Sequence, residues 1–589
     1  MSRTLRATAV AGLAAAALAA GALPAAAAGP AKNDPLDAGG PGGAVAAEAG
    51  AGFGRTPAGP QRLLVTFADT PRRDEAGARL GDIGAIVPVL PEAGVWSLTP
   101  DDPPRARDRA LARPEVQSAE WSLARRAAER PRPAPPAPLG PPPAFTDPLF
   151  TPDGQWTLLS GRPVWGTDLT TLPARPRIAI LDSGVDATHE EWAGPSSPLV
   201  AGRSTLRGSS DASDGGDSGH GTHVAGIAAA PANGVGIVGV APALGPTAQV
   251  IPVQIANRFG ESSDLTMIKG IRHAVRNGAK VVNISAGGEG EARAFQEAIL
   301  WATRQGAVIV ASVGNDYRNT LNYPAAYRRV LGVGAQCDAQ VTTDCPRPNG
   351  VAAFSNRNRS VDVIAPGVNV LSSVPRRVTE RVVRPGYALK DGTSMSAAYV
   401  SGVAALVMAS NGNALSPYQV VRQIKNTADD VAPGGRDLAS GYGVINPRAA
   451  VTLTAPADDE SEVNDDIKWL TSSQRLAQLG QRATVEATID RYEDSDDVYA
   501  LTMQRGERVR IKLHYRRGVA DLYLWRPGTT TVGTQRPTYR RNLIRYIGGA
   551  RKRKTIVYQA KKNGRHFVNV FARRGNTDYT VTLERLRPR

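Results

Sequence analysis

Asp391-Gly392-Thr393-Ser394-Met395-Ser396 leads into a run of mostly Ala, Val and Leu that extends to Val407. Because that run has no polar face, it predicts a helix buried inside a large domain. Gly392 permits a sharp turn that places Ser394 at or near the helix N-terminus, where the dipole and unpaired N–H groups favour negative charge on its oxygen. Ser394 is therefore either a candidate nucleophile or an ordinary N-cap serine. Partners elsewhere in the chain have to decide between the two.

Upstream of this helix, apolar runs of strand length alternate with helical stretches. The run Ile178–Leu181 ends in Asp182, as a buried parallel strand ends at a loop that carries a site, although an aspartate there can simply cap a turn. The alternation predicts an open parallel α/β sheet with ligands at the carboxyl ends of its strands. The other expected strands are Val250–Val253, Val281–Ile284, Ala307–Val310 and Val330–Val333, and the expected helices are Gly221–Ala230, Asp264–Asn277 and Ala292–Gln305.

A histidine pair opens the first of these helices. His220 and His223 lie in a run of small residues, which allow close packing and hold His220 rigidly at the helix start. Two histidines at this spacing also match metal ligands. However, the H-E-x-x-H glutamate is lacking and no acidic third ligand follows on the helix. We therefore favour His220 as a partner of Ser394.

The three segments together resemble subtilisin-type serine proteases (subtilases), whose catalytic residues follow in the order Asp…His…Ser. The resemblance extends from about Asp147 to Asn446. It implies that His220 takes the Ser394 proton as general base and that Asp182 orients the imidazole and stabilises its positive charge. It also implies an oxyanion hole made by Asn315 and the Ser394 backbone N–H. The matching segments are Ile180–Asp186, His220–Gly226 and Gly392–Ser396.

The same resemblance assigns the substrate-binding segment. Ser285, Ala286 and Gly287 are expected to bind substrate as an added strand, a mode that reads main chain and tolerates many sequences. Asn322 is expected in the wall of the primary pocket, close to a cis bond before Pro324. Many relatives have glycine where this chain has Asn322, so the pocket is expected to be shallower and more polar.

A structural calcium site is a further expectation from the resemblance. Glu191 and Asn233 match positions where relatives bind calcium through oxygen atoms. Glu replaces the more usual Asp, and the alternative is that both side chains are merely solvated. No cofactor is expected for catalysis.

The N-terminal part predicts an exported precursor. Residues 1–28 have a basic start, an apolar run and small terminal residues, as in a cleaved secretory signal, with a signal-anchor helix as the alternative. Residues 29–60 are a low-complexity segment. Residues 61–125 predict a βαββαβ domain and resemble the family's inhibitory propeptide, and residues 126–146 form a proline-rich linker. Self-cleavage is expected between Leu123 and Asp147.

The C-terminal part differs in charge. Of the 70 Lys and Arg residues, 23 lie between Arg505 and Arg589 together with only 4 acidic residues, so the net charge of +16 belongs to this end. Residues 456–589 resemble the small β-sandwich found after secreted bacterial peptidases. The insertion around Pro527–Lys562 is expected either to bind polyanions or to be a solvated basic loop. A local disulfide is expected between Cys337 and Cys345.

The predicted architecture is α/β: a subtilisin-like parallel sheet between helices in residues 147–455, preceded by a small α+β propeptide and followed by a β-sandwich. The predicted function is that of a secreted serine endopeptidase, made as a self-processing precursor that acts on proteins and peptides and is inhibited by its own propeptide. The mature form is expected to have no membrane span. The alternative is a catalytically silent protein that binds surfaces or polyanions on a subtilase scaffold.

Overall fold

The computed structural model describes most of the chain beyond the first sixty residues. The predicted signal peptide, the low-complexity segment and most of the proline-rich linker lie outside the described residues. Residues 62–127, 146–150, 174–193, 197–244, 248–337, 344–431, 435–456, 464, 466–467, 470, 482–490, 495–532, 539–574 and 576–586 are described.

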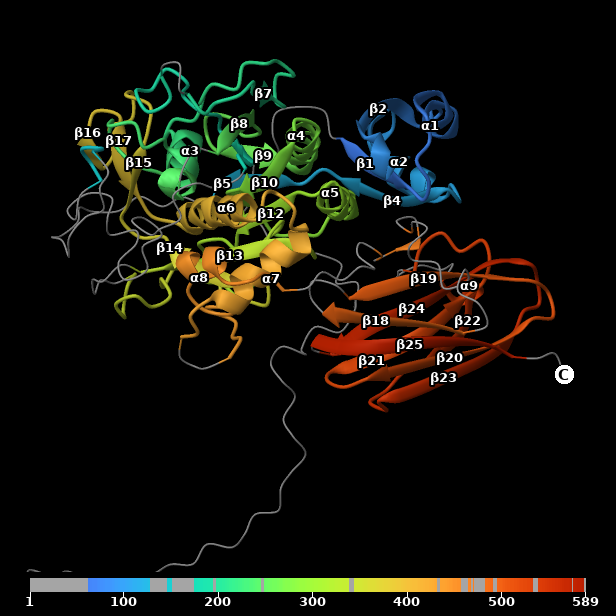
Figure 1. Cartoon of the computed structure of the whole chain (residues 1–589). Helices are drawn as coiled ribbons and strands as arrows, with labels where there is room; N and C mark the ends of the chain where they lie inside the picture. The colour runs from blue at the N-terminus through green and yellow to red at the C-terminus, as the bar shows by residue number, and fades with distance from the viewer. Residues whose placement is uncertain are drawn as a thin grey trace, which may run out of the picture. The chain divides into compact units, whose positions relative to one another are not determined.

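The N-terminal domain has the predicted βαββαβ order. Its sheet has the strand order β2-β3-β1-β4, and each pairing is antiparallel. Side chains of β1 alternate: Leu63, Val65 and Phe67 pack against the two helices, whereas Leu64 joins the core of the following domain. One face of this sheet thus packs against the two helices of the same domain, and the other face packs on the central domain. The elements are β1 (Leu63–Phe67), α1 (Arg73–Leu80), β2 (Gly84–Leu90), β3 (Val95–Pro100), α2 (Pro103–Leu111) and β4 (Val116–Trp121) (Figure 1).

The central domain is built on a seven-stranded parallel sheet in the order β14-β13-β12-β10-β6-β8-β7. The five predicted strands are all present within it, so the predicted α/β fold is confirmed. Strands β7 and β14 were not predicted. The strands are β6 (Arg177–Asp182), β7 (Arg203–Ser204), β8 (Gln249–Gln254), β10 (Ala279–Ile284), β12 (Val308–Ser312), β13 (Val330–Gln336) and β14 (Val363–Pro366).

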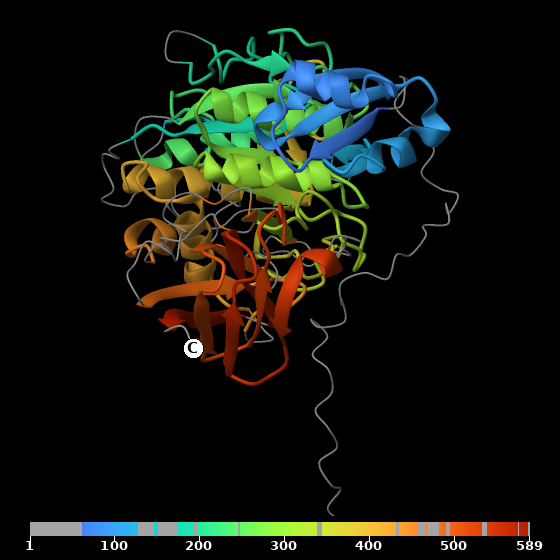
Figure 2. The ribbon, with the colours of Figure 1, turned by 90° about the vertical axis from the view of Figure 1, so that its right-hand side faces the viewer.

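Helices cover both faces of this sheet, because alternate residues of each buried strand point to opposite sides. Ile178 and Ile180 of β6 share a core with α3 and α6, whereas Ala179 and Leu181 share a second core with α4 and α5. The layers can be followed in Figure 2. These helices are α3 (His220–Ala229), α4 (Asp264–Arg276), α5 (Arg293–Arg304) and α6 (Thr393–Ser410), and α7 (Pro417–Thr427) and α8 (Pro447–Thr452) follow.

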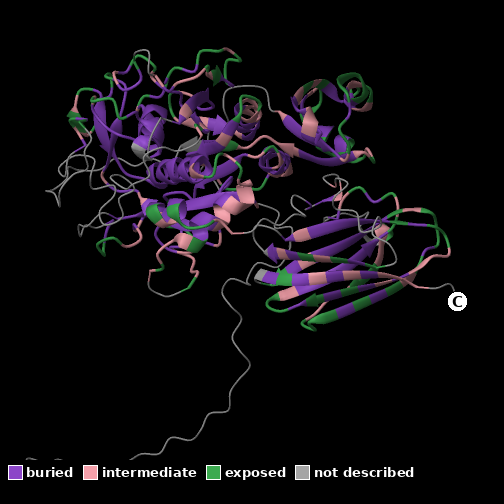
Figure 3. Ribbon diagram, in the orientation of Figure 1, coloured by how far each residue is buried: buried purple, intermediate pink, exposed green. Residues whose placement is uncertain are grey.

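Helix α6 is the predicted buried helix. Every residue from Thr393 to Ala409 is buried (Figure 3). By length and composition alone α6 is apolar enough to cross a membrane, yet 94% of that window is buried inside the protein, as expected for the central helix of a large core.

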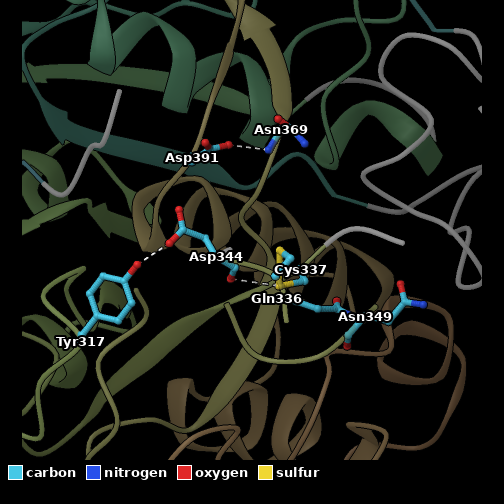
Figure 4. The surroundings of a disulfide bond; sticks show 8 residues. Tyr317, Gln336, Cys337, Asp344, Asn349, Asn369 and Asp391 are labelled. Carbon is cyan, nitrogen blue, oxygen red and sulfur yellow. Dashed lines mark hydrogen bonds between the residues drawn. A yellow bond between two sulfur atoms is a disulfide. The ribbon is translucent and has the colours of Figure 1, made fainter. Parts of the chain in front are cut away.

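Smaller antiparallel elements complete the central domain. A three-stranded sheet, β15-β17-β16, leads into α6, and a second sheet has the order β11-β5-β9. The predicted disulfide joins Cys337 and Cys345, with a Cα–Cα distance of 5.4 Å, and packs against Phe354. Close by, the Tyr317 hydroxyl donates to Asp344 (Figure 4). The strands are β5 (Ala124–Ala127), β9 (Glu261–Ser263), β11 (Ala286–Gly287), β15 (Val370–Ser373), β16 (Val382–Arg384) and β17 (Tyr387–Lys390).

The C-terminal domain is a sandwich of two antiparallel sheets, β18-β25-β20-β23 and β19-β24-β21-β22. Alternation along β20 places Val509, Ile511 and Leu513 in the core between the sheets. The domain contains β18 (Arg482–Asp490), β19 (Asp496–Met503), β20 (Arg508–Tyr515), β21 (Val519–Trp525), α9 (Tyr539–Asn542), β22 (Leu543–Ile547), β23 (Arg553–Gln559), β24 (Gly564–Arg574) and β25 (Asn576–Leu586).

Candidate active site

Ser394 lies in the first turn of α6, directly after a backbone turn that only glycine adopts readily. Gly392 is the N-cap, with φ of 152° and ψ of 159°, a region essentially restricted to glycine. The Ser394 hydroxyl donates to the backbone carbonyl of Ser285 at 3.1 Å, and the Ser285 hydroxyl donates to the backbone carbonyl of Ser394 at 3.1 Å. Ser394 is therefore not a capping serine, and its side chain points across to the strand end that carries Ser285.

A chain of buried polar groups holds Ser285 in place. Asn283, in β10, donates from Nδ2 to the Ser285 hydroxyl at 2.9 Å and accepts from the Ser401 hydroxyl at 2.9 Å. Ser401 lies on α6 two turns beyond Ser394. The end of β10 and helix α6 are thus connected by two sets of hydrogen bonds, one at Ser394 and one at Ser401.

Asp182 and His220 form the second buried pair. Asp182 ends β6 and His220 begins α3, and Asp182 Oδ1 is 2.7 Å from His220 Nδ1. The same carboxylate oxygen accepts from the Ser183 backbone N–H at 2.8 Å. Because a carboxylate only accepts, His220 carries its proton on Nδ1. The other ring nitrogen, Nε2, is then available as a base.

The structure rejects the metal alternative for the histidine pair. His223 is fully buried, and its Nε2 donates to the carbonyls of Val370 at 3.0 Å and Ala388 at 3.1 Å. Burial lowers the pKa of His223 well below its usual value, so the ring is neutral. His223 therefore fastens α3 to β15 and β17, while His220 turns to Asp182.

The two pairs lie at the ends of adjacent strands. Strands β6 and β10 are parallel neighbours in which Leu181 is opposite Ile284, so the residues that follow, Asp182 and Ser285, emerge at the same sheet edge. Helices α3 and α6 pack closely, because a Cβ on Gly402 would lie 2.9 Å from the Ala228 carbonyl. The fold thus brings the four side chains of Asp182, His220, Ser285 and Ser394 to one edge of the sheet.

A carboxylate that the sequence analysis missed supports this arrangement. Asp214 is buried and accepts from the Ser183 hydroxyl at 2.8 Å and the Thr222 backbone N–H at 3.0 Å. Ser183 in turn accepts from the Gly221 N–H at 3.0 Å. Burial raises the pKa of Asp214, and these hydrogen bonds lower it. Asp214 ties the end of β6 to the start of α3; its only sequence signal was its place in a Gly/Ser/Asp-rich loop.

Asn315 follows β12, the next parallel strand. Its Oδ1 accepts from the Thr393 backbone N–H at 3.0 Å and the Thr393 hydroxyl at 2.8 Å. These two donors fix the amide orientation, and its buried Nδ2 has no acceptor among the described residues. A preorganised donor therefore lies beside Ser394, as oxyanion stabilisation requires.

The expected substrate-binding segment forms an edge strand that is already paired. β11 (Ala286–Gly287) pairs antiparallel with β5, whose other edge pairs with β9. A strand from the N-terminal part of the chain thus lies between two strands of the central domain. It crosses the predicted boundary between residues 125 and 126.

Asn322 lies next to β11. It is buried, its Nδ2 donates to the Ser312 carbonyl at 3.3 Å, and a Cβ on Gly287 would lie 2.5 Å from that nitrogen. The Tyr323–Pro324 bond is cis, as predicted. Asp316, which follows Asn315, is exposed.

The expected calcium ligands differ in their surroundings. Glu191 is completely buried; its Oε1 accepts from the Ile237 N–H at 2.7 Å, and its Oε2 has no partner among the described residues. Burial raises the pKa of Glu191 to about 8. Asn233 is exposed, and its Oδ1 accepts from the Val235 N–H at 2.9 Å. The part of the chain that the structure describes contains no group of three or more His, Cys, Asp or Glu side chains that could hold a metal ion.

Comparisons with known proteins found relatives of this chain. A profile described as the subtilase family matches residues 174–443. M-protease from Shouchella clausii (strain KSM-K16) is 33% identical over 307 residues, which cover 51% of this chain and 72% of that protein. Subtilisin Savinase from Lederbergia lenta is 35% identical over 274 residues, covering 46% of this chain and 90% of that protein.

A solved structure shares the fold. Fervidolysin from Fervidobacterium pennivorans, described as a keratinolytic enzyme related to subtilisin, superposes with a TM-score of 0.53 and 22% identity. The match covers 85% of this chain and 85% of that chain, so the likeness extends beyond the central domain.

Proposed function

Because the chain belongs to the subtilase family of serine endopeptidases, we propose that it hydrolyses peptide bonds with Asp182, His220 and Ser394 as its catalytic triad. The observation that carries this assignment is the 2.7 Å hydrogen bond between Asp182 and His220. Asp182 ends β6, and the neighbouring strand β10 leads to Ser285, whose backbone carbonyl accepts from the Ser394 hydroxyl. These four residues are far apart in the sequence.

The chemistry follows from the protonation of the pair. With its Nδ1 proton bound to Asp182, His220 takes the Ser394 hydroxyl proton on Nε2 while the oxygen attacks the substrate carbonyl. Asp182 stabilises the resulting imidazolium, which then gives its proton to the leaving amine. An acyl-enzyme on Ser394 remains, and water attacks it with His220 again acting as base. Asn315 Nδ2 and the Ser394 backbone N–H stabilise the oxyanion in both steps.

The substrate is bound as a strand beside Ser285, Ala286 and Gly287, with Asn322 next to the pocket that receives the side chain before the cleaved bond. The pairing of β5 supports this mode, because β5 uses the same edge of β11 that a substrate needs. We infer that β5 marks the path of an extended peptide through the active site.

We further infer that the protein is made as a self-processing precursor whose residues 61–125 inhibit it. Glu120 of β4 accepts from the Arg293 N–H at 2.7 Å and so caps the N-terminus of α5, while β5 fills the substrate strand position. Ala286 pairs with Ala127, so the next residue, Ala128, is assigned to the position opposite Ser285, beside Ser394. The cleaved bond is then Ala128–Glu129. N-terminal sequencing of the mature protein tests this: a first residue other than Glu129 contradicts the assigned bond, and a start outside residues 124–147 contradicts self-processing in this region.

Export follows from the signal-like residues 1–28, and we propose that the mature enzyme is extracellular. Western blotting of cell and medium fractions, with the full chain compared with a chain lacking residues 1–28, tests this. Retention of both forms in cells would contradict it.

Glu191 is the proposed ligand of a structural calcium ion. A completely buried carboxylate suits a divalent cation, which would also lower its raised pKa. Asn233 contributes only if it releases its bond to Val235. Calcium is expected to raise the melting temperature of the wild type, and to raise that of Glu191→Gln by clearly less.

The C-terminal sandwich carries a second proposed activity, the binding of polyanions. A cavity of about 560 Å³ there has four cationic side chains and no acidic one among the described residues that line it. We expect heparin retention that weakens steeply with salt and is lost in a chain that ends at Ala455. Equal retention of the shortened chain would refute it. The lining residues are Arg526, Pro527, Leu543, Ile544, Arg545, Ile556, Val557, Tyr558, Lys561, Lys562 and His566.

A fluorophosphonate probe tests the proposed chemistry. We expect the processed wild type to be labelled and Ser394→Ala to remain unlabelled. An unlabelled wild type would favour the alternative, a catalytically silent binding protein on the same scaffold.

A further inference from the structure

Arg125 of β5 is a cation buried in the wall of the active site. Its side chain and that of Asp264 are both fully inaccessible to solvent, and Arg125 Nε lies 2.7 Å from Asp264 Oδ1. The rest of the guanidinium is used as well. Nη1 donates to the carbonyls of Gly288 at 2.7 Å and Glu289 at 3.0 Å, and Nη2 donates to the carbonyl of Gly290 at 2.9 Å.

The central domain supplies the entire described pocket. Asp264 begins α4 directly after β9, and residues 288–290 follow β11 directly. These are the two strands between which β5 lies. The pocket therefore belongs to the same surface that binds an extended peptide, and an incoming substrate meets it once β5 has left.

The chemistry of this pocket selects a guanidinium. Burying a cation is costly unless it is paired and its donors are bound, and here one carboxylate and three carbonyls accept four hydrogen bonds from the planar donor fork. Lysine has a single ammonium group without that fork and cannot make the same set of bonds. A small side chain would leave Asp264 without its counter-ion. The backbone N–H of Leu123, which donates to Asp264 Oδ2 at 3.1 Å, holds the carboxylate in place.

Strand register sets the position of this arginine relative to the cleaved bond. Arg126 pairs with Gly287 and Ala127 with Ala286, so the next residue of an extended peptide is opposite Ser285, whose carbonyl holds the Ser394 hydroxyl. The peptide bond after that residue is the one exposed to Ser394. Arg125 is three residues before it.

We propose that Asp264 and the carbonyls of Gly288, Glu289 and Gly290 form a guanidinium subsite that makes this protease select substrates with arginine three residues before the residue whose carbonyl is attacked. The inference rests on the proposed function. It extends the role of Arg125 from the chain's own precursor to the polypeptides that the mature enzyme cleaves.

The test compares chromogenic tetrapeptides with processed wild-type enzyme. One has the chain's own sequence Arg-Arg-Ala-Ala before the cleaved bond; the others carry Ala or Lys in place of the first Arg. We expect kcat/KM for the Arg peptide to exceed that for the Ala peptide by about 10- to 100-fold, the range of a hydrogen bond to a charged partner, with the Lys peptide between them. Equal values for the Arg and Ala peptides would overturn the proposal.

Two matched variants locate the selectivity. Asp264→Asn keeps the shape of the side chain and removes its charge, and should lower kcat/KM for the Arg peptide about tenfold or more while the Ala peptide stays within about twofold. Glu291→Gln removes an exposed charge next to the subsite, at a residue that makes none of its hydrogen bonds, and should preserve the selectivity. Equal losses for both peptides in Asp264→Asn, or the same loss of selectivity in Glu291→Gln, would overturn the assignment.

A second measurement does not depend on how well Asp264→Asn folds. Precursors carrying Arg125→Lys or Arg125→Ala release the same mature protease, so only processing is altered. We expect processing to slow in the order wild type, Arg125→Lys, Arg125→Ala, and unchanged rates would count against the subsite. Fluorophosphonate labelling and cleavage of the Ala peptide report the proposed function separately. An enzyme that is labelled but does not discriminate refutes the subsite alone.

Discussion

The central domain and the C-terminal sandwich each contain a cluster of buried polar side chains, and the two clusters differ. In the sandwich, the Tyr499 and Tyr579 hydroxyls are 2.6 Å apart and Tyr579 donates to Asp497, so the hydroxyls of this cluster are hydrogen-bonded to one another. In the central domain, Asn315 Nδ2 is buried and still has no acceptor among the described residues. A completed network stabilises a fold, whereas a held but unused donor is available to a transition state.

The two regions also place these groups differently. In the central domain, Asp182, Ser285 and Asn315 lie at or after the ends of parallel strands, and His220 and Ser394 lie in the first turns of helices. In the sandwich they lie within the strands. Substitutions should therefore alter activity in the first region and stability in the second.

Ser394→Ala should show the largest effect on the activity side of this contrast. We expect kcat to fall about a millionfold, a magnitude taken from subtilisin, a member of the same family, rather than derived from the present geometry. The unprocessed precursor should accumulate, and its melting temperature should stay close to that of the wild type.

Ser401→Ala provides the control, because it removes a buried hydroxyl from the same helix without touching the reacting atoms. It should keep most of the activity. Comparable inactivation of both variants would show that buried hydroxyls of α6 matter through folding.

Lys554→Met should show the largest effect on the stability side. Lys554 is fully buried, donates to the Gly549 carbonyl at 2.6 Å and lies 3.6 Å from Asp521. Losing the ammonium leaves a buried carboxylate without this partner, which costs about 3–5 kcal/mol. Hydrogen exchange in β20 and β23 should speed up while peptide hydrolysis is unchanged.

The exposed neighbour Lys552 is the matched control. Lys552→Met should change stability by less than about 0.5 kcal/mol. A marked fall in kcat for Lys554→Met, beside the lowered stability of the sandwich, would show that the two regions are not independent.

Asn315→Ala sharpens the same comparison, because it removes the unused donor. We expect kcat to fall about 100- to 1000-fold with little change in KM, again by the value known for subtilisin. Steady-state kinetics with one of the tetrapeptides measures this. A raised KM with unchanged kcat would assign Asn315 to ground-state binding instead.

Glu120→Gln should have the smallest effect, which is confined to the pH dependence of propeptide release. Burial raises the pKa of Glu120 to about 7, with Arg293 lowering it and Glu291 raising it. Because this pKa exceeds the ordinary value of about 4.5, the contribution of Glu120 to propeptide binding is fully present below about pH 4.5 and is lost as the pH rises through 7. Release of the processed propeptide should be faster at pH 8 than at pH 5, and less so in Glu120→Gln. An equal pH dependence in both proteins would exclude this role.

Local sequence patterns were sufficient for much of this protein. Unbroken apolar runs identified the buried strands, and the absence of a polar face identified α6 as a core helix, because burial on all sides leaves no room for alternation. Motif spacing pointed to Asp182, His220 and Ser394, and to Asn315 through the family resemblance.

The tertiary structure decided which groups meet. Arg125 and Asp264 are 139 residues apart, and their pairing depends on β5 entering between β9 and β11, which no local pattern encodes. Asp214 likewise looked like one more loop acid until the fold placed it against Ser183. Periodicity within a segment reports only whether that segment is buried. Which distant partner completes a buried charge depends on strand register between segments that the sequence keeps far apart.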